Sequence, residues 1–292
     1  MHSVSQKLLV LLVILVLPYP LFSARWKWVM SFNSDNMSNY MKYPTSVYYD
    51  GKLKRYYVVD SGNNRLLSFD VKGNFISQFD AGGRLLWPYD MRKEGKSILW
   101  VVERGKNSLT YIDLKKRLIK ENTLKLPSGD IVFPTRLEIK DGKIFLLDRS
   151  SGAIVVYDKN LNYLGLIKPS TGDFGGFIDF KIKDNKLWCL DPIKRKVYSF
   201  SLDGKEIDAV VLKGSVDFPI SVEIDNMGYI YILDRHAGNI KVFGRDGSLA
   251  YTMLEQGETQ GCVYYPIQIV FDGMGRLLVV EEGNGRIEVF ER

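Results

Sequence analysis

The chain has 292 residues, a formal net charge of +6, 13% aromatic residues, two cysteines and two histidines. The cysteines, Cys189 and Cys262, lie far apart in the sequence and are not expected to pair, so stability must come from packing of the aromatic residues. Two histidines leave little for zinc catalysis, which usually takes about three protein ligands.

The first 24 residues have the composition of a secretory signal peptide. Lys7 is followed by apolar residues from 8 to 17, then by Pro18-Tyr19-Pro20 and by the small pair Ser23-Ala24. The apolar run is shorter than the roughly 20 residues of a membrane helix. Phe22 stands where cleavage prefers a small residue, so an uncleaved anchor formed by residues 8–22 is the alternative. We expect an exported protein, periplasmic or extracellular, whose residues 25–292 form one large all-β domain.

An acidic residue recurs along the rest of the chain at steps of 43 to 47 residues. Its six positions are Asp60, Glu103, Asp148, Asp191, Asp234 and Glu281. A proline precedes five of these acids by 14 to 16 residues, and Phe177 takes its place in the fourth unit. Self-similarity at this period is typical of a β-propeller, because one blade cannot bury both faces of its sheet.

Each unit contains short runs of strand length that are rich in Val, Ile and aromatic residues. In the first unit these runs cover residues 47–49, 56–59, 65–69 and 75–79, and turns such as residues 72–74 join them as hairpins. The sixth unit stops after its third run, at Arg292. The sequence therefore predicts an all-β fold, a six-bladed propeller of four-stranded antiparallel blades that lacks one strand at its C-terminal end.

The missing strand is expected at the N-terminal end of the domain. Residues 26–32 place Trp26, Trp28, Met30 and Phe32 on one face at period two. Pairing this segment with residues 286–290 would close the ring and leave no exposed sheet edge there. An independent N-terminal strand is the alternative.

The segment Asp60-Ser61-Gly62-Asn63-Asn64-Arg65-Leu66-Leu67-Ser68-Phe69 resembles an NHL repeat, as do residues 281–290 and, more loosely, 234–243. The resemblance covers nearly all of residues 25–292, although units two, three and four depart from the pattern in the loops after their acids. It implies a six-bladed propeller, commonly a platform that binds protein, nucleic acid or glycan, with lactonases and lyases among its relatives.

The recurring acid is interpreted as structural, because a residue type at fixed spacing in every unit serves something that each blade needs. Its carboxylate is expected to accept backbone N–H bonds in the loop between the second and third strands. Function is better sought where the units differ from one another.

The units differ two residues after the proline, where side chains can point into the central channel. This predicted channel ring consists of Ser46, Asp90, Arg136, Asp179, Ser221 and Gln268. Arg136 could bridge Asp90 and Asp179 in the neighbouring blades. A plug of polar side chains is one interpretation, and a divalent cation held by Asp90 and Asp179 is the other, although Arg136 would oppose it.

The loops after the acids share a face with the channel mouth and carry many cations. This predicted basic rim contains Arg104, Lys106, Arg149, Lys194, Arg195, Lys196, Arg235 and His236. Such a cluster attracts phosphates, sulfates, uronates or acidic proteins, unless it is ordinary solvated surface. Acidic neighbours such as Glu282 could offset its charge.

No catalytic residue is assigned from the sequence. His236 has no second histidine nearby for a zinc site, since His2 lies in the segment expected to be removed, and Ser46 and Ser221 have no evident base. Trp87 and Tyr89 could stack on nucleic-acid bases, but export argues against that partner.

We therefore predict an exported, monomeric propeller that acts as a binding scaffold for a protein or an anionic polysaccharide, with an enzyme less favoured and no cofactor required. The alternative is a cation-dependent lactonase or hydrolase of the gluconolactonase type at the same mouth, for which Asp90, Asp179 and Gln268 would be the available ligands.

Overall fold

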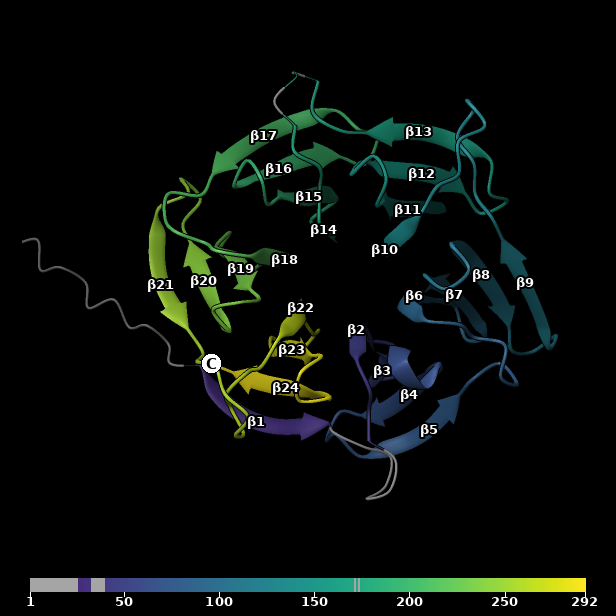
Figure 1. Ribbon diagram of the computed structural model, residues 1–292, viewed down its shortest axis with the longest axis horizontal. Helices are drawn as coiled ribbons and strands as arrows, with labels where there is room; N and C mark the ends of the chain where they lie inside the picture. Colours follow the sequence, from purple (N-terminus) through teal and green to yellow (C-terminus); the bar gives the residue numbers. More distant parts are fainter. Residues whose placement is uncertain (1–25, 33–39, 171, 173) are drawn as a thin grey trace, which may run out of the picture.

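The computed structural model describes residues 26–32, 40–170, 172 and 174–292, so the predicted signal peptide or anchor lies outside the described residues. Six four-stranded antiparallel sheets stand around a common axis, as Figure 1 shows. The six-bladed propeller predicted from the repeat is confirmed. Among the described residues, no helix has the length and apolar character needed to cross a membrane.

The strands follow one another from the centre of each blade to its rim. Blades 1 and 2 consist of β2 (Pro44–Asp50), β3 (Arg55–Asp60), β4 (Arg65–Asp70), β5 (Phe75–Phe79), β6 (Pro88–Glu94), β7 (Ile98–Glu103), β8 (Ser108–Asp113) and β9 (Leu118–Asn122). Blades 3 and 4 consist of β10 (Pro134–Lys140), β11 (Lys143–Asp148), β12 (Ile154–Asp158), β13 (Tyr163–Ile167), β14 (Asp179–Lys183), β15 (Lys186–Asp191), β16 (Lys196–Ser201) and β17 (Glu206–Val211). Blades 5 and 6 consist of β18 (Pro219–Ile224), β19 (Ile230–Asp234), β20 (Asn239–Phe243), β21 (Leu249–Met253), β22 (Pro266–Phe271), β23 (Leu277–Glu281), β24 (Arg286–Glu291) and β1 (Lys27–Phe32). A 3-10 turn, η1 (Ser61–Asn63), follows β3.

The ring is closed by β1, which pairs with β24 as the sequence predicts. One detail of that prediction is wrong. A bulge between Trp28 and Met30 pairs Trp28 with Phe290 and Met30 with Val289, so the apolar side chains are divided between the two faces of the strand. Trp26 packs in the core shared with blade 5, whereas Phe32 packs against blade 1. The strand therefore seals both neighbouring interfaces.

The core lies between blades, where the inner faces of adjacent sheets meet. In the core between blades 6 and 1, Phe32, Tyr56 and Phe69 are fully buried, and the Phe32 ring lies 5.0 Å from Tyr56 and 5.2 Å from Phe69. Each such aromatic side chain buries a large apolar area and makes the blade depend on its neighbour. Cys189 and Cys262 are both free thiols, in agreement with the sequence.

Candidate functional site

The recurring acids hold together the loops of one face, which we call the mouth face. This face carries the loop that leads into each first strand and the loop between the second and third strands. Every acid is buried and accepts a backbone N–H bond from the segment just before its own first strand. The bonds run from Lys42 to Asp60 (2.7 Å), Leu86 to Glu103 (2.6 Å), Phe133 to Asp148 (2.8 Å), Gly175 to Asp191 (2.8 Å), Asp217 to Asp234 (2.7 Å) and Tyr264 to Glu281 (2.8 Å).

The predicted contact with the loop between the second and third strands is also present in several blades. Asp148 accepts from the N–H of Ser150 and Ser151, and Asp191 accepts from Ile193 and Lys194. The structural role predicted for the acid is therefore confirmed, and it extends to a second loop. Each carboxylate satisfies donors of both loops at once, which fixes their relative position.

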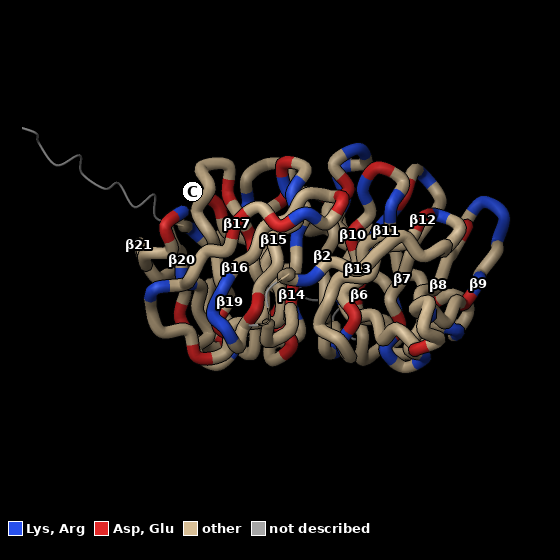
Figure 2. Tube along the Cα trace, turned by 90° about the horizontal axis from the view of Figure 1, so that it is seen from above, with Lys and Arg blue, Asp and Glu red and all other residues tan. Residues whose placement is uncertain are grey.

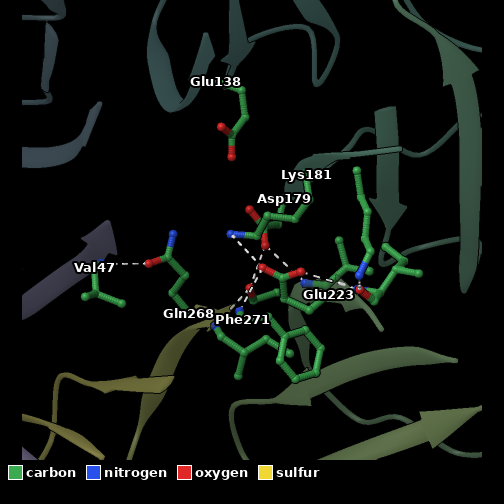
Figure 3. Close-up of polar contacts among 12 residues, drawn as sticks. Val47, Glu138, Asp179, Lys181, Glu223, Gln268 and Phe271 are labelled. Carbon is green, nitrogen blue, oxygen red and sulfur yellow. Dashed lines mark hydrogen bonds and ion pairs between the residues drawn. The ribbon is translucent and has the colours of Figure 1, made fainter. Parts of the chain in front are cut away.

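The predicted channel ring is buried and links neighbouring blades. Its carboxylate, amide and hydroxyl oxygens accept N–H bonds from the next blade: Gln268 from Val47 (2.9 Å), Asp90 from Leu137 (3.0 Å), Asp179 from Val222 (3.0 Å) and Ser221 from Ile269 (3.2 Å). Figure 3 shows the bond between Val47 and Gln268. Most of these residues therefore belong to the framework.

Arg136 crosses the channel rather than bridging two carboxylates. Its guanidinium donates to the carbonyl oxygens of Thr45 (3.0 Å) and Ile267 (3.1 Å), and its Nε lies 3.6 Å from Oδ1 of Asp179. The predicted partnership with Asp179 is present. Asp90 instead pairs with Arg92, at 2.9 Å. Although burial lowers it, the pKa of Arg136 is raised by Tyr89 and the two carboxylates, which keeps the side chain charged.

The two ring carboxylates do not fit a cation site. Asp90 accepts from Arg92 and from two backbone N–H groups, and Asp179 accepts from Ser221 and Val222 and faces Arg136. In the part of the chain that the structure describes, no three His, Cys, Asp or Glu side chains gather so as to hold a metal ion. A divalent cation needs several oxygen ligands. Here three of the four carboxylate oxygens accept hydrogen bonds from protein donors, and the fourth, Oδ1 of Asp179, faces Nε of Arg136, whose charge opposes a cation.

A second ring of charged side chains lies two residues further along the first strands, towards the opposite end of the channel. It consists of Arg92, Glu138, Lys181 and Glu223 and lines a cavity of about 370 Å³. Arg92 makes a bidentate pair with Glu138. Nζ of Lys181 lies 4.0 Å from Oε1 of Glu223. Figure 3 shows Lys181 and Glu223 side by side. Burial raises the pKa of Glu223 to about 7, against the opposite effect of Lys181. The second ring was not predicted from the sequence. Because alternate residues of a strand point to the same side, the residues two positions after the channel ring were the signal for it.

A pocket of about 570 Å³ opens on the mouth face among blades 1, 2, 3 and 6, within the size range of small-molecule sites. It is lined by Tyr43, Thr45, Ser61, Trp87, Tyr89, Arg104, Gly105, Arg149 and Glu282. A bulge after Pro88 re-aims Tyr89, so that this residue lines the pocket while its neighbour Asp90 joins the channel ring. The Tyr89 ring lies between Arg104, 4.3 Å away, and Arg136, 5.0 Å away.

The predicted basic rim converges only in part. Arg104 and Arg149 line the pocket, whereas Arg195 and His236 do not. Arg235 pairs with Glu282 at 2.6 Å, as the sequence suggested for that acid, and exposed His236 stacks on Phe218 at 4.4 Å. Lys106 pairs with Glu103 and Glu121. Figure 2 shows positive and negative residues interspersed over both faces of the disc, so the local positive charge of the pocket comes from Arg104 and Arg149.

Fold and site define a six-bladed β-propeller with an aromatic and cationic pocket at one end of its channel. No family model matches the chain, and no curated protein matches it. Solved structures do. A streptogramin B lyase has a TM-score of 0.66 and 13% identity over 92% of this chain and 98% of that one. Virginiamycin B lyase from Staphylococcus aureus has a TM-score of 0.65 and 15% identity, covering 92% and 100%.

A gluconolactonase from Xanthomonas campestris also matches, with a TM-score of 0.64 and 15% identity over 85% of this chain and 86% of that one. At 13–15% identity, the feature shared with these enzymes is the fold. The NHL resemblance agrees with them in architecture, and membership of the NHL family stays a prediction.

Proposed function

We propose that the mouth pocket binds an anionic carbohydrate, with Arg104 and Arg149 contacting its acid group and the aromatic side chains contacting its ring. One observation carries the proposal: Tyr43, Trp87 and Tyr89 surround the same pocket as the two arginines. Aromatic faces offer apolar area to the C–H face of a sugar ring, and guanidinium groups donate charge-assisted bonds to carboxylates. Of the two predicted partners, a protein and an anionic polysaccharide, these groups support the polysaccharide.

Trigalacturonate is a suitable first probe, with maltotriose as the neutral control. Binding is measured by calorimetry and by the change in tryptophan fluorescence, to which Trp87 in the pocket contributes. Arg104→Glu and Arg149→Glu are each expected to weaken binding at least tenfold, since a lost charge-assisted bond is worth about 1.5–3 kcal/mol. Arg195→Glu is the matched control, because it makes the same charge change on the same face outside the pocket. Equal loss in all three variants, or equal affinity for maltotriose, would contradict the proposal.

The second candidate is an enzyme that acts on such a ligand in the same pocket. The comparisons favour it, because the solved structures named above are lyases and a gluconolactonase with this fold. Among the residues that line the pocket, Tyr89 offers a hydroxyl group beside the two arginines and Glu282 offers a carboxyl group, and either could transfer a proton. Asp90 and Asp179 offer no support for a cation-dependent form.

Catalysis is tested by incubating the protein with gluconolactone and with acidic oligosaccharides and following acid release and new unsaturated products. Turnover that Tyr89→Phe or Glu282→Gln abolishes while trigalacturonate still binds would establish an enzyme. Recovery of every substrate unchanged, with binding intact, would leave a binding protein. Export remains part of the proposal and is supported by the composition of residues 1–24. Cell fractionation of the full chain tests it.

A further inference from the structure

Aromatic residues stand directly before the proline of the first strand in five of the six blades. They are Tyr43, Trp87, Phe133, Phe218 and Tyr265, while blade 4 has Gly176 before Phe177. Trp87 is 53% exposed, Tyr43 49%, Phe218 43% and Tyr265 41%, so these rings face solvent on the mouth face rather than the core. Because blades 5, 6, 1, 2 and 3 are consecutive around the ring, the five residues form one arc, which we call the aromatic arc.

Three members of the arc have a backbone conformation that aromatic residues seldom adopt. The φ angles of Tyr43, Trp87 and Tyr265 are 51°, 48° and 44°, in the left-handed region. This conformation is unusual for a bulky residue and is further disfavoured before proline. Strain of this kind persists only where the surrounding structure imposes it, and it gathers at binding sites.

Bonds from the repeated acid and a glycine two residues after it accompany this conformation. Glu103 accepts from the N–H of Leu86, and the N–H of Arg104 donates to the carbonyl oxygen of Trp87 at 3.0 Å. In blade 6, Glu281 accepts from Tyr264, and Glu282 donates to Tyr265 at 3.2 Å. The two loops are in close contact, because a Cβ atom on Gly105 would lie 2.8 Å from the carbonyl oxygen of Leu86.

This glycine occurs only in the three blades whose aromatic residue has a positive φ angle. Gly62, Gly105 and Gly283 belong to blades 1, 2 and 6, and a Cβ atom on any of them would lie within 2.6–2.8 Å of the carbonyl oxygen of the facing loop. The same position holds Ser150, Ile193 and His236 in blades 3, 4 and 5. The framework thus presents three exposed rings, in the consecutive blades 6, 1 and 2, in an equivalent geometry.

Cations accompany these rings. Arg235 lies 5.5 Å from the ring of Tyr265, Lys42 lies 5.9 Å from Tyr43, and Arg104 lies 4.3 Å from Tyr89, two residues after Trp87. Glu282 neutralises Arg235, which keeps the charge density of the arc moderate. One exposed ring per blade, with Lys42 supplied by blade 1 and Arg104 by blade 2, matches a chain of acidic sugars, in which each unit offers one apolar ring face and at most one carboxylate.

We propose that the aromatic arc is an extended binding surface for a polyuronate chain, with the blades of Tyr265, Tyr43 and Trp87 each forming one subsite. This inference rests on the proposed function, because the mouth pocket lies within the arc. It adds a length requirement. Successive subsites on one ligand raise affinity with chain length until the surface is filled.

The test measures the affinity of galacturonate oligomers from two to eight units for the full-length protein and its variants. Affinity is expected to rise with length in the wild type. Tyr265→Ala, outside the mouth pocket, is expected to weaken binding of the octamer roughly two- to tenfold and to leave the dimer unaffected. Ile193→Ala is the control, because Ile193 is 70% exposed on the same face in blade 4, outside the arc.

Several outcomes would overturn the arc. They are an affinity independent of length, an equal effect of Tyr265→Ala and Ile193→Ala, and binding of polyglutamate as tight as that of polygalacturonate. The last result would identify an acidic protein as the partner. If only the arc proposal is wrong, Arg104→Glu still weakens binding of the dimer. If the proposed function is wrong, Arg104→Glu has no effect on dimer binding, so the two results distinguish the proposals. Circular dichroism and thermal unfolding confirm that each variant is folded.

Discussion

Arg136 and Asp179 of the neighbouring blades 3 and 4 meet inside the central channel, with Nε of the arginine 3.6 Å from Oδ1 of the aspartate. The arginine belongs to blade 3 and also donates to carbonyl oxygens of blades 1 and 6, so one buried side chain connects four blades. The Arg136 side chain therefore spans the channel below the mouth pocket, and we call it the crossbar. This arrangement makes the ring residues determinants of stability.

Replacement of Arg136 by Met is expected to destabilise the protein by about 3–5 kcal/mol, because it leaves a buried carboxylate and two carbonyl oxygens without their partner. Denaturant unfolding followed by tryptophan fluorescence measures the change. Exposed Arg149→Met should cost about 0.5 kcal/mol or less. If the two variants unfold at the same denaturant concentration, the crossbar contributes nothing.

Glu223 should make stability depend on pH between about 4.5 and 7. Burial raises its folded-state pKa to about 7 from an ordinary value of 4.5, so the folded protein holds this proton more tightly than the unfolded chain. Its contribution is complete below the lower value and is lost as pH rises through the upper one.

Glu223→Gln should remove this contribution and make the protein more stable than the wild type above pH 7, by up to roughly 3 kcal/mol. Melting temperatures of both proteins from pH 4 to 9 give the difference curve. Glu281, whose pKa burial also raises to about 7, is present in both proteins and cancels in that difference. A difference that does not vary with pH would show that Glu223 is ionised throughout.

Asp148→Ala should cost about 2–4 kcal/mol, because the buried carboxylate accepts bonds from the backbone N–H groups of Phe133, Ser150 and Ser151 and its removal takes away all three. Asp158→Ala, in an exposed turn of the same blade, should cost less. Chemical denaturation compares the two. An equal loss would mean that the repeated acid is no more important than an ordinary turn residue.

The two thiols should differ in reactivity. Cys189 is fully buried, and burial raises the pKa of its thiol, whereas Cys262 is partly exposed. A colourless disulfide reagent that releases a coloured thiolate should titrate one thiol in the native protein and two in denaturant. Rapid reaction of both thiols in the native state would indicate that blade 4 opens easily.

The sequence was sufficient for the fold because blades are local and repeated. Strands Arg65–Asp70 and Phe75–Phe79 match the predicted runs to within one residue, and the acid, the proline and the hairpin turns recur at one period. Even the closing strand could be predicted, since a ring of six blades lacked one strand at its C-terminal end. The bulge at Trp28 could not, because it depends on the register with Phe290 at the far end of the chain.

The site was harder to predict, because its residues come from different blades. The sequence identified Arg104 and Arg149 as basic loop residues, but equally Arg195, and nothing local distinguishes a side chain that points to the pocket from one that points away. Trp87 and Tyr89 were identified as single aromatic residues. The aromatic residue that precedes the proline in five of the six units was not recognised as a repeated feature, although the sequence contains it.

The amino-acid sequence by itself determined six blades, their strand order and the closure of the ring, because each depends on contacts within about 45 residues or on the period of the repeat. Only the tertiary structure decided which side chains share a pocket, which charges neutralise one another and that Arg136 spans the channel. Those relationships arise when separate blades pack around one axis, which brings residues of different repeats into contact, as it does Thr45 and Arg136, 91 positions apart.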